Sequence, residues 1–124
     1  LARKEEYTEA LAYFYKVEYL EKNPDNARRA IAWCSFLSGK YEEALKYYLL
    51  LIQQPSPKAH DWMNTGHVYF VQHQLQEALF HYQKAHAMET NHTAFIEKFN
   101  KDKSVLLNLG LNKEDIQIML DLLL

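Results

Sequence analysis

The sequence predicts an all-α fold made of stacked antiparallel helix pairs. The tripeptide Glu-Ala-Leu occurs three times at an interval of 34 residues, beginning at Glu9, Glu43 and Glu77. A fixed period of this length is typical of one helical unit that is copied and stacked. The chain also contains few helix breakers, with 3 Gly and 3 Pro among 124 residues. Both observations favour long helices joined by short turns.

Large apolar residues accompany each tripeptide at helical spacing. They lie three residues before and four residues after the alanine, so they share one helix face with it. In chain order these positions hold Tyr7 and Phe14, Tyr41 and Tyr48, and Leu75 and Tyr82. The small alanine predicts a close approach of a neighbouring helix, and the bulky residues fill the groove beside it.

The third unit carries the fullest motif. It reads Trp-Met-Asn-Thr-Gly-His-Val-Tyr from Trp62 to Tyr69 and continues with Ala78, Tyr82 and Ala85. This pattern resembles the tetratricopeptide repeat, a 34-residue helix–turn–helix unit with the pattern W-x2-L-G-x2-Y, A-x3-F and P. The resemblance covers residues 1–92 and implies a right-handed superhelix of antiparallel helix pairs, an α-solenoid, with a C-terminal helical cap. An ordinary helical bundle with coincidental spacing is the alternative.

The match to the repeat is incomplete in places. Thr65 stands where Leu is usual, Tyr82 where Phe is usual, and Thr90 near the usual Pro. The first helix of the preceding unit fits less well, since Arg28 takes the Trp position and Ser35 the Tyr position.

Turn residues divide the chain into helices. We expect helices over residues 4–22, 26–38, 41–54, 58–72 and 75–88. Asn23-Pro24-Asp25 makes the first break, with Asp25 or Asn26 as the N-cap. Gly39 ends the second helix, and Pro55-Ser56-Pro57 follows the third. In repeat terms, a single domain contains the second helix of a truncated repeat in 1–24, repeats in 25–58 and 59–92, and capping helices in 93–124. Because the chain begins at Leu1 within a repeat, we expect a fragment of a longer protein.

The last 32 residues lose the repeat motif but keep helical spacing. Apolar residues continue through Leu109, Gly110 is a natural C-cap, and Asn112 is a natural N-cap with Asp115 three residues on. A final helix is expected over 113–123, with apolar residues at Ile116, Met119, Leu120 and Leu123. Repeat arrays need a terminal cap, which is our main interpretation of this tail. Two alternatives are that it folds into the concave groove, or that it resembles a ubiquitin-associated three-helix module.

Composition excludes several partners. The net charge of −2 and the pI near 6.3 give no basic patch for nucleic acid and no polybasic membrane anchor. No apolar run is long enough to span a membrane. The single Cys34 cannot form an internal disulfide, and we expect it to be a small buried residue. A cytoplasmic location is favoured.

Catalysis and cofactors are not expected. The material for a metal site is six histidines, His60, His67, His73, His81, His86 and His92. None of these pairs has the i, i+4 spacing typical of a helical zinc site. The sequence also lacks paired catalytic carboxylates, a Gly-rich phosphate loop and a Ser nucleophile motif.

The resemblance also implies where a partner binds. In tetratricopeptide proteins the first helix of each pair lines the concave surface. The matching positions here are Asn26, Arg29, Trp33, Phe36 and Leu37 in one repeat, and His60, Met63, Asn64, His67 and Phe70 in the next. Phe36, Leu37 and Phe70 could equally be core residues. Arg29, Trp33, Asn64 and His67 are favoured as binding residues, because Arg, Asn and His are costly to bury unpaired.

These positions predict a non-enzymatic protein–protein interaction module. Some family members grip the C-terminal carboxylate of a peptide with a Lys and Asn clamp. Here the corresponding positions hold Arg29 with Trp33, and Met63 with His67, so the clamp pattern is absent. We therefore expect an extended or helical peptide segment of a partner, held by apolar contacts.

A structural scaffold or self-association domain is the alternative function, with the C-terminal helices filling the groove. The first helix lacks its repeat partner, so Tyr7, Leu11 and Phe14 would expose an apolar face. That face predicts a possible homodimer.

Overall fold

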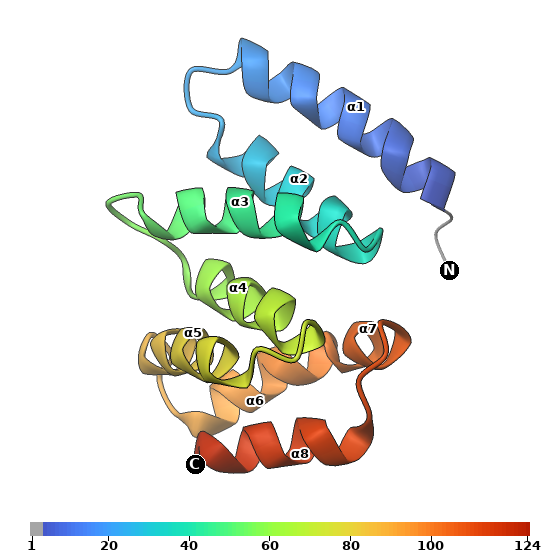
Figure 1. The fold of residues 1–124 in the computed structure, drawn as a ribbon. Coiled ribbons are helices and arrows are strands. Elements are labelled where there is room, and N and C mark those ends of the chain that lie inside the picture. The colour runs from blue at the N-terminus through green and yellow to red at the C-terminus, as the bar shows by residue number, and fades with distance from the viewer. Residues whose placement is uncertain (1–3) are drawn as a thin grey trace. The chain divides into compact units, whose positions relative to one another are not determined.

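The chain is all-helical wherever its structure is described. A computed structural model describes residues 4–124, with Lys4 described by its backbone alone. The helices in this range are α1 Lys4–Leu20, α2 Asp25–Leu37, α3 Tyr41–Ile52, α4 Ala59–Val71, α5 Leu75–Ala87, α6 His92–Lys101, α7 Lys103–Asn108 and α8 Lys113–Leu122 (Figure 1). The prediction of an all-α fold of packed adjacent helix pairs is confirmed. The chain divides into two compact units after Pro57, next to the expected boundary between repeats.

The first unit contains α1, α2 and α3, and α2 packs against both neighbours. The α1 helix ends at Leu20, two residues earlier than expected. The expected N-cap of α2 was wrong, because Pro24 takes that position and no side chain caps the helix. Proline suits a helix start, where its missing N–H costs nothing. Asn23 instead accepts a bond from the Asp25 amide, with 3.3 Å between Oδ1 and N.

Both repeat turns contain a residue with positive φ. Gly39 joins α2 to α3 with φ +81°, and His73, 34 residues later, joins α4 to α5 with φ +60°. Glycine adopts this region freely, whereas a side chain there costs of order 1 kcal/mol. The two turns therefore share one backbone geometry, but His73 holds it under strain.

The 34-residue register fixes how each pair packs. Ala44 in α3 and Ala78 in α5 are both fully buried, and so are Tyr48 and Tyr82 one helical turn later. In the second unit, a Cβ at Gly66 would lie 2.7 Å from the ring of Tyr82. This glycine therefore lets α4 and α5 approach closely.

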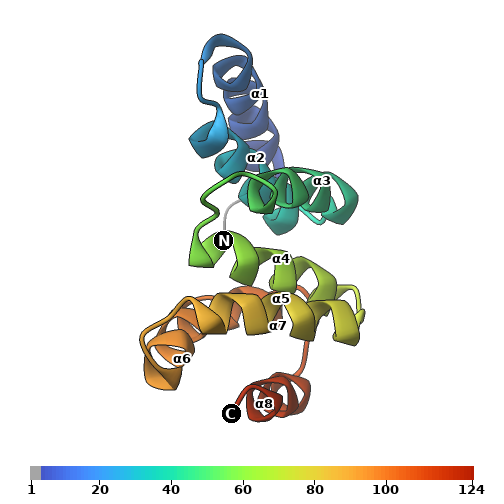
Figure 2. The same ribbon diagram turned by 90° about the vertical axis from the view of Figure 1, so that its left-hand side faces the viewer.

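In the tail of the second unit, the helical spacing expected through Leu109 is divided between two helices. A break at Asp102 separates α6 from α7, and α7 ends before Gly110, where φ is +111°. The predicted cap of α8 is confirmed, since Asn112 Oδ1 accepts from the Asp115 amide at 2.8 Å. Within this unit α8 lies on the side of α5 and α6 that faces away from α4, in both views (Figures 1 and 2). Its four expected apolar residues, Ile116, Met119, Leu120 and Leu123, are buried.

Candidate functional site

The α2 helix presents a polar and aromatic stripe. Asn26 is exposed, and Arg29 and Trp33 are half-buried, at spacings of three and four residues along one helix face. Arg29 Nη1 donates to Asn26 Oδ1 at 3.0 Å, which holds the guanidinium along the stripe. The Trp33 ring rests on the ring of Phe36, with centroids 5.6 Å apart. This stripe offers a cation, an amide and a flat apolar surface on one rigid element.

Phe36 belongs to the core of its unit. Its side chain is fully buried, and its ring lies 6.0 Å from that of Tyr41 at the start of α3. Leu37 beside it is half-buried. Phe36 is therefore a core residue, and its ring packs against that of Trp33.

The expected residues on α4 divide into two groups. His60 is exposed, and its Nε2 lies 3.6 Å from Oδ1 of the buried Asp61, while Asn64 is half-buried. Met63 and Phe70 are buried in the second unit. Of the binding residues expected on α4, only His60 and Asn64 keep surface that solvent can reach.

His67 is enclosed rather than exposed. Its Nδ1 lies 2.6 Å from the Tyr82 hydroxyl, and its Nε2 lies 3.0 Å from Oδ2 of Asp102. The ring of Phe99 covers it edge-on, with centroids 5.3 Å apart. The expectation of exposure rested on the cost of burying an unpaired histidine. That reasoning fails here because both ring nitrogens have partners.

The donors in this network can be assigned from chemistry. A carboxylate only accepts, so Nε2 of His67 carries the hydrogen and donates to Asp102. In the neutral imidazole the Nδ1 atom is then the acceptor, and the Tyr82 hydroxyl donates to it. Burial, and to a lesser degree the charge of Asp102, raise the pKa of Tyr82 well above its ordinary value. The hydroxyl thus stays protonated as a donor, and the network joins α4, α5 and the α6–α7 break.

Tyr82, His67 and Asp102 are hydrogen-bonded in series, as in a proton relay, but only the Asp102 side chain has surface that solvent reaches. Neither the tyrosine nor the histidine side chain reaches solvent. Its role in this geometry is to satisfy buried polar atoms and to fasten the C-terminal segment to the α4–α5 pair.

A second polar network lies in the first unit and was missed by the sequence reasoning. Glu18 accepts from Arg28 Nε and from the Tyr47 hydroxyl, both at 3.1 Å. Tyr15 donates to Glu43 at 3.3 Å. Burial first, and then the bond to Glu18, raise the pKa of Tyr47 to about 12. The network ties α1 to α2 and α3, and the large sequence separations hid it.

Two histidines meet in the second unit without forming a metal site. His86 Nε2 lies 3.0 Å from His92 Nδ1, a hydrogen-bond distance, where α5 meets α6. Within residues 4–124, no group of three or more His, Cys, Asp and Glu side chains is placed to hold a metal ion. Cys34 is half-buried, and burial raises the pKa of its thiol.

The expected dimer face on α1 is packed differently. Leu11 is buried, and Tyr7 and Phe14 are half-buried. Exposure of Leu11 was therefore a wrong expectation, because α1 packs against α2. The exposed large hydrophobic residues of α1 are Tyr13, Tyr15, Tyr19 and Leu20.

Comparison with protein-family models, curated proteins and solved structures finds no match. Among the described helices, none combines the length and apolar character needed to cross a membrane.

Proposed function

We propose that the chain is a protein-interaction module of the tetratricopeptide type, which binds a polypeptide segment on the inner helices of its repeats. The observation that carries the proposal is the accessible stripe of Asn26, Arg29 and Trp33 on a helix whose opposite face is locked in the core. Arg and Trp are the side chains that most often dominate binding energy at protein interfaces. A rigid helix can present them with little loss of entropy on binding.

The repeated packing supports the proposal that the pairs stack as a right-handed superhelix. Equivalent alanines and tyrosines are buried at the same register in the two units, and both repeat turns have positive φ. In such an array the stripe on α2 belongs to the concave face. We infer a partner segment with a carboxylate for Arg29 and an apolar side chain for Trp33.

One observation favours a scaffold role as the second candidate. On α4 the C-terminal segment covers His67 through Phe99 and Asp102. The tail thus occupies part of the face that the repeat pattern assigns to a partner. In this alternative the helix pairs mainly connect other parts of a longer protein.

The test is a pull-down from a lysate of the source cells. Wild-type chain is compared with Arg29→Ala/Trp33→Ala and with Lys16→Ala/Tyr19→Ala, a control that removes one exposed cation and one exposed aromatic ring from α1. Circular dichroism checks that all three baits are folded. We expect a partner that the control retains and that the α2 variant loses by at least tenfold, because two anchor side chains are removed.

Other outcomes reject specific parts of the proposal. Equal recovery by all three baits would place binding away from α2. Loss with the α1 control would assign binding to α1. If no protein is retained by the wild-type bait, the scaffold role is favoured.

A further inference from the structure

We propose that the second unit carries a separate docking site for a polypeptide segment that presents one large apolar side chain flanked by Lys or Arg. The site is a cleft between α8 and the turn that joins α4 to α5. It lies on elements other than the α2 stripe, and it does not depend on the function proposed above.

The cleft is apolar and has the volume of one side chain. It measures about 160 Å³, and the buried Phe70 and Met119 form part of its lining. Its other apolar walls are Leu75, Ile118 and Leu122, which are 54%, 59% and 58% exposed. An apolar cavity of about 150 Å³ holds a benzene molecule. The cleft therefore fits one aromatic or branched aliphatic side chain.

The outer face of α8 is more apolar than a cap requires. The helix already buries Ile116 and Met119 among its inner residues, which is what closes the end of the unit. A helix that only capped the array would present a polar outer face to water. Ile118 and Leu122 instead lie one turn apart on the exposed side, next to the cleft.

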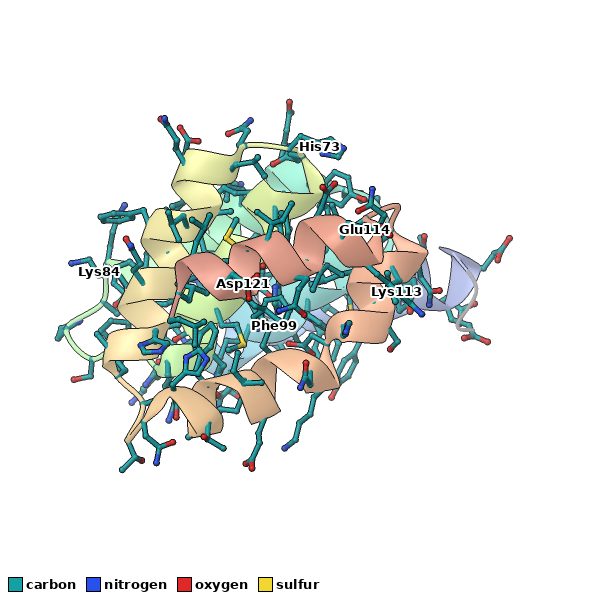
Figure 3. The ribbon with its side chains drawn as sticks, turned by 90° about the horizontal axis from the view of Figure 1, so that it is seen from below. His73, Lys84, Phe99, Lys113, Glu114 and Asp121 are labelled. Atoms are coloured by element: carbon teal, nitrogen blue, oxygen red, sulfur yellow. The ribbon has the colours of Figure 1, made fainter. Side chains whose placement is uncertain are left out.

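The charge around the cleft is acidic. The α8 sequence holds three carboxylates, Glu114, Asp115 and Asp121, against a single cation, Lys113. Glu114 and Asp115 suit the positive end of the helix dipole. Asp115 also lines the cleft itself, whereas Asp121 accepts from Gln117 Nε2 at 2.9 Å and borders a different pocket on the side of α6. Figure 3 shows Glu114 and Asp121 on α8.

This charge selects the occupant. Glu114, Ile118 and Leu122 follow one another at intervals of four residues, and Asp115 lines the cleft beside them, so acidic and apolar groups share one face. A segment with Lys or Arg next to its apolar anchor meets charges of opposite sign. Anionic lipid and nucleic acid would meet like charge. A contact built on one side chain is small, so we expect a transient complex of micromolar affinity.

The experiment selects peptides from a displayed library of random dodecapeptides. The full chain is the target, and Ile118→Ser/Leu122→Ser serves for counter-selection. Both side chains are exposed, so this variant should fold, which circular dichroism verifies. A selected peptide is then synthesised, and fluorescence anisotropy measures its affinity. We expect peptides that share one Leu, Ile, Met, Phe or Trp and carry net positive charge.

Three further measurements separate the causes. Affinity should fall at least tenfold for Ile118→Ser/Leu122→Ser. It should fall severalfold for Glu114→Gln/Asp115→Asn at about 0.05 M salt, and this difference should shrink at about 0.5 M salt. A control, Tyr19→Ser/Leu20→Ser, removes a pair of exposed apolar residues from the first unit and should leave affinity unchanged.

Several results would overturn the inference. One is a selection in which no peptide depends on Ile118 and Leu122. Another is enrichment of neutral or acidic peptides. A third is a wild-type chain that self-associates through these two residues in sedimentation experiments, because the occupant would then be a second copy. Binding of free indole in the cleft without any peptide binding would assign it to a small molecule instead.

Discussion

The contact between Gly66 and Tyr82 sets how closely α4 and α5 pack, and we predict that Gly66→Ala destabilises the second unit. The added Cβ would lie 2.7 Å from Cδ1 and Cε1 of the tyrosine ring. Comfortable carbon–carbon contact begins near 3.5 Å, so the ring or the helix must move by roughly 0.8 Å. The ring has little room to move. Its hydroxyl is bonded to His67, and Phe99 packs edge-on against it at 5.5 Å.

The magnitude follows from two opposing effects. Overpacking a close-packed core costs about 1–3 kcal/mol. Alanine is also about 1 kcal/mol better than glycine inside a helix. Because the Tyr82 ring is fully buried and fixed at its hydroxyl, we take the upper part of the first range. The net loss in the free energy of unfolding should be about 1–2 kcal/mol.

Urea unfolding measures this loss. In a Trp33→Phe background, fluorescence of Trp62 reports the second unit alone, because each unit contains one tryptophan. Combining Gly66→Ala with Tyr82→Leu removes the clashing ring atoms, so a double-mutant cycle should show a coupling of about 1 kcal/mol. Gly110→Ala is the control, since nothing lies within 4 Å of its added Cβ and its cost arises from φ. If Gly66→Ala is as stable as wild type or more so, the packing argument is refuted.

Three other predictions test the networks and the strained turn. His67→Leu should lower the free energy of unfolding by about 1–3 kcal/mol in the same urea assay, because Tyr82 and Asp102 lose their buried partner; no change would contradict the network. Thermal melts should show His73→Gly more stable and His73→Val less stable, each by about 1 kcal/mol, since only glycine tolerates the positive φ; the opposite order would refute the strain. The pKa of Tyr47 is raised in the folded state, so its contribution to the free energy of unfolding is complete below pH 10 and is lost as pH rises toward about 12. Spectrophotometric titration should show this late ionisation, and Glu18→Gln should move it to lower pH; an unchanged titration would exclude the bond as its cause.

The sequence was sufficient to predict the helices, because their signals are local. Periodic apolar positions mark the helix faces. Gly39 and Gly110 mark helix ends through their own backbone preference, and Asn112 marks a helix start through a hydrogen bond to the residue three positions on. The buried alanines followed from the same periodicity. The N-cap of α2 was missed because a proline can begin a helix without any side-chain cap.

The parts that could not be predicted depend on distant partners. His67 pairs with Asp102 across 35 residues, and Tyr47 pairs with Glu18 across 29. Nothing in the local pattern distinguishes a histidine that faces a groove from one enclosed by a later segment. The break at Asp102 was hidden for the same reason, since Asp102 is the residue that pairs with His67.

The positions of the α2 stripe could be predicted from the sequence, whereas the α8 cleft could not. The positions of Asn26, Arg29 and Trp33 follow from the repeat motif, and these residues keep accessible surface. Their role in binding stays a prediction. The pattern of α8 identified its buried residues correctly. It could not show that Ile118 and Leu122 border a cleft, because the opposite wall comes from the α4–α5 turn.

Because His67 pairs with Asp102, the segment that folds together is longer than the 34-residue repeat. Counted by motif, the third repeat closes at residue 92, yet Phe95, Phe99 and Asp102 complete the surroundings of its central tyrosine and histidine. In amide hydrogen exchange, α6 should therefore open together with α5 as one cooperative block. A chain shortened at the motif boundary would leave buried polar groups without partners, so the minimal fold must extend past the break before α7.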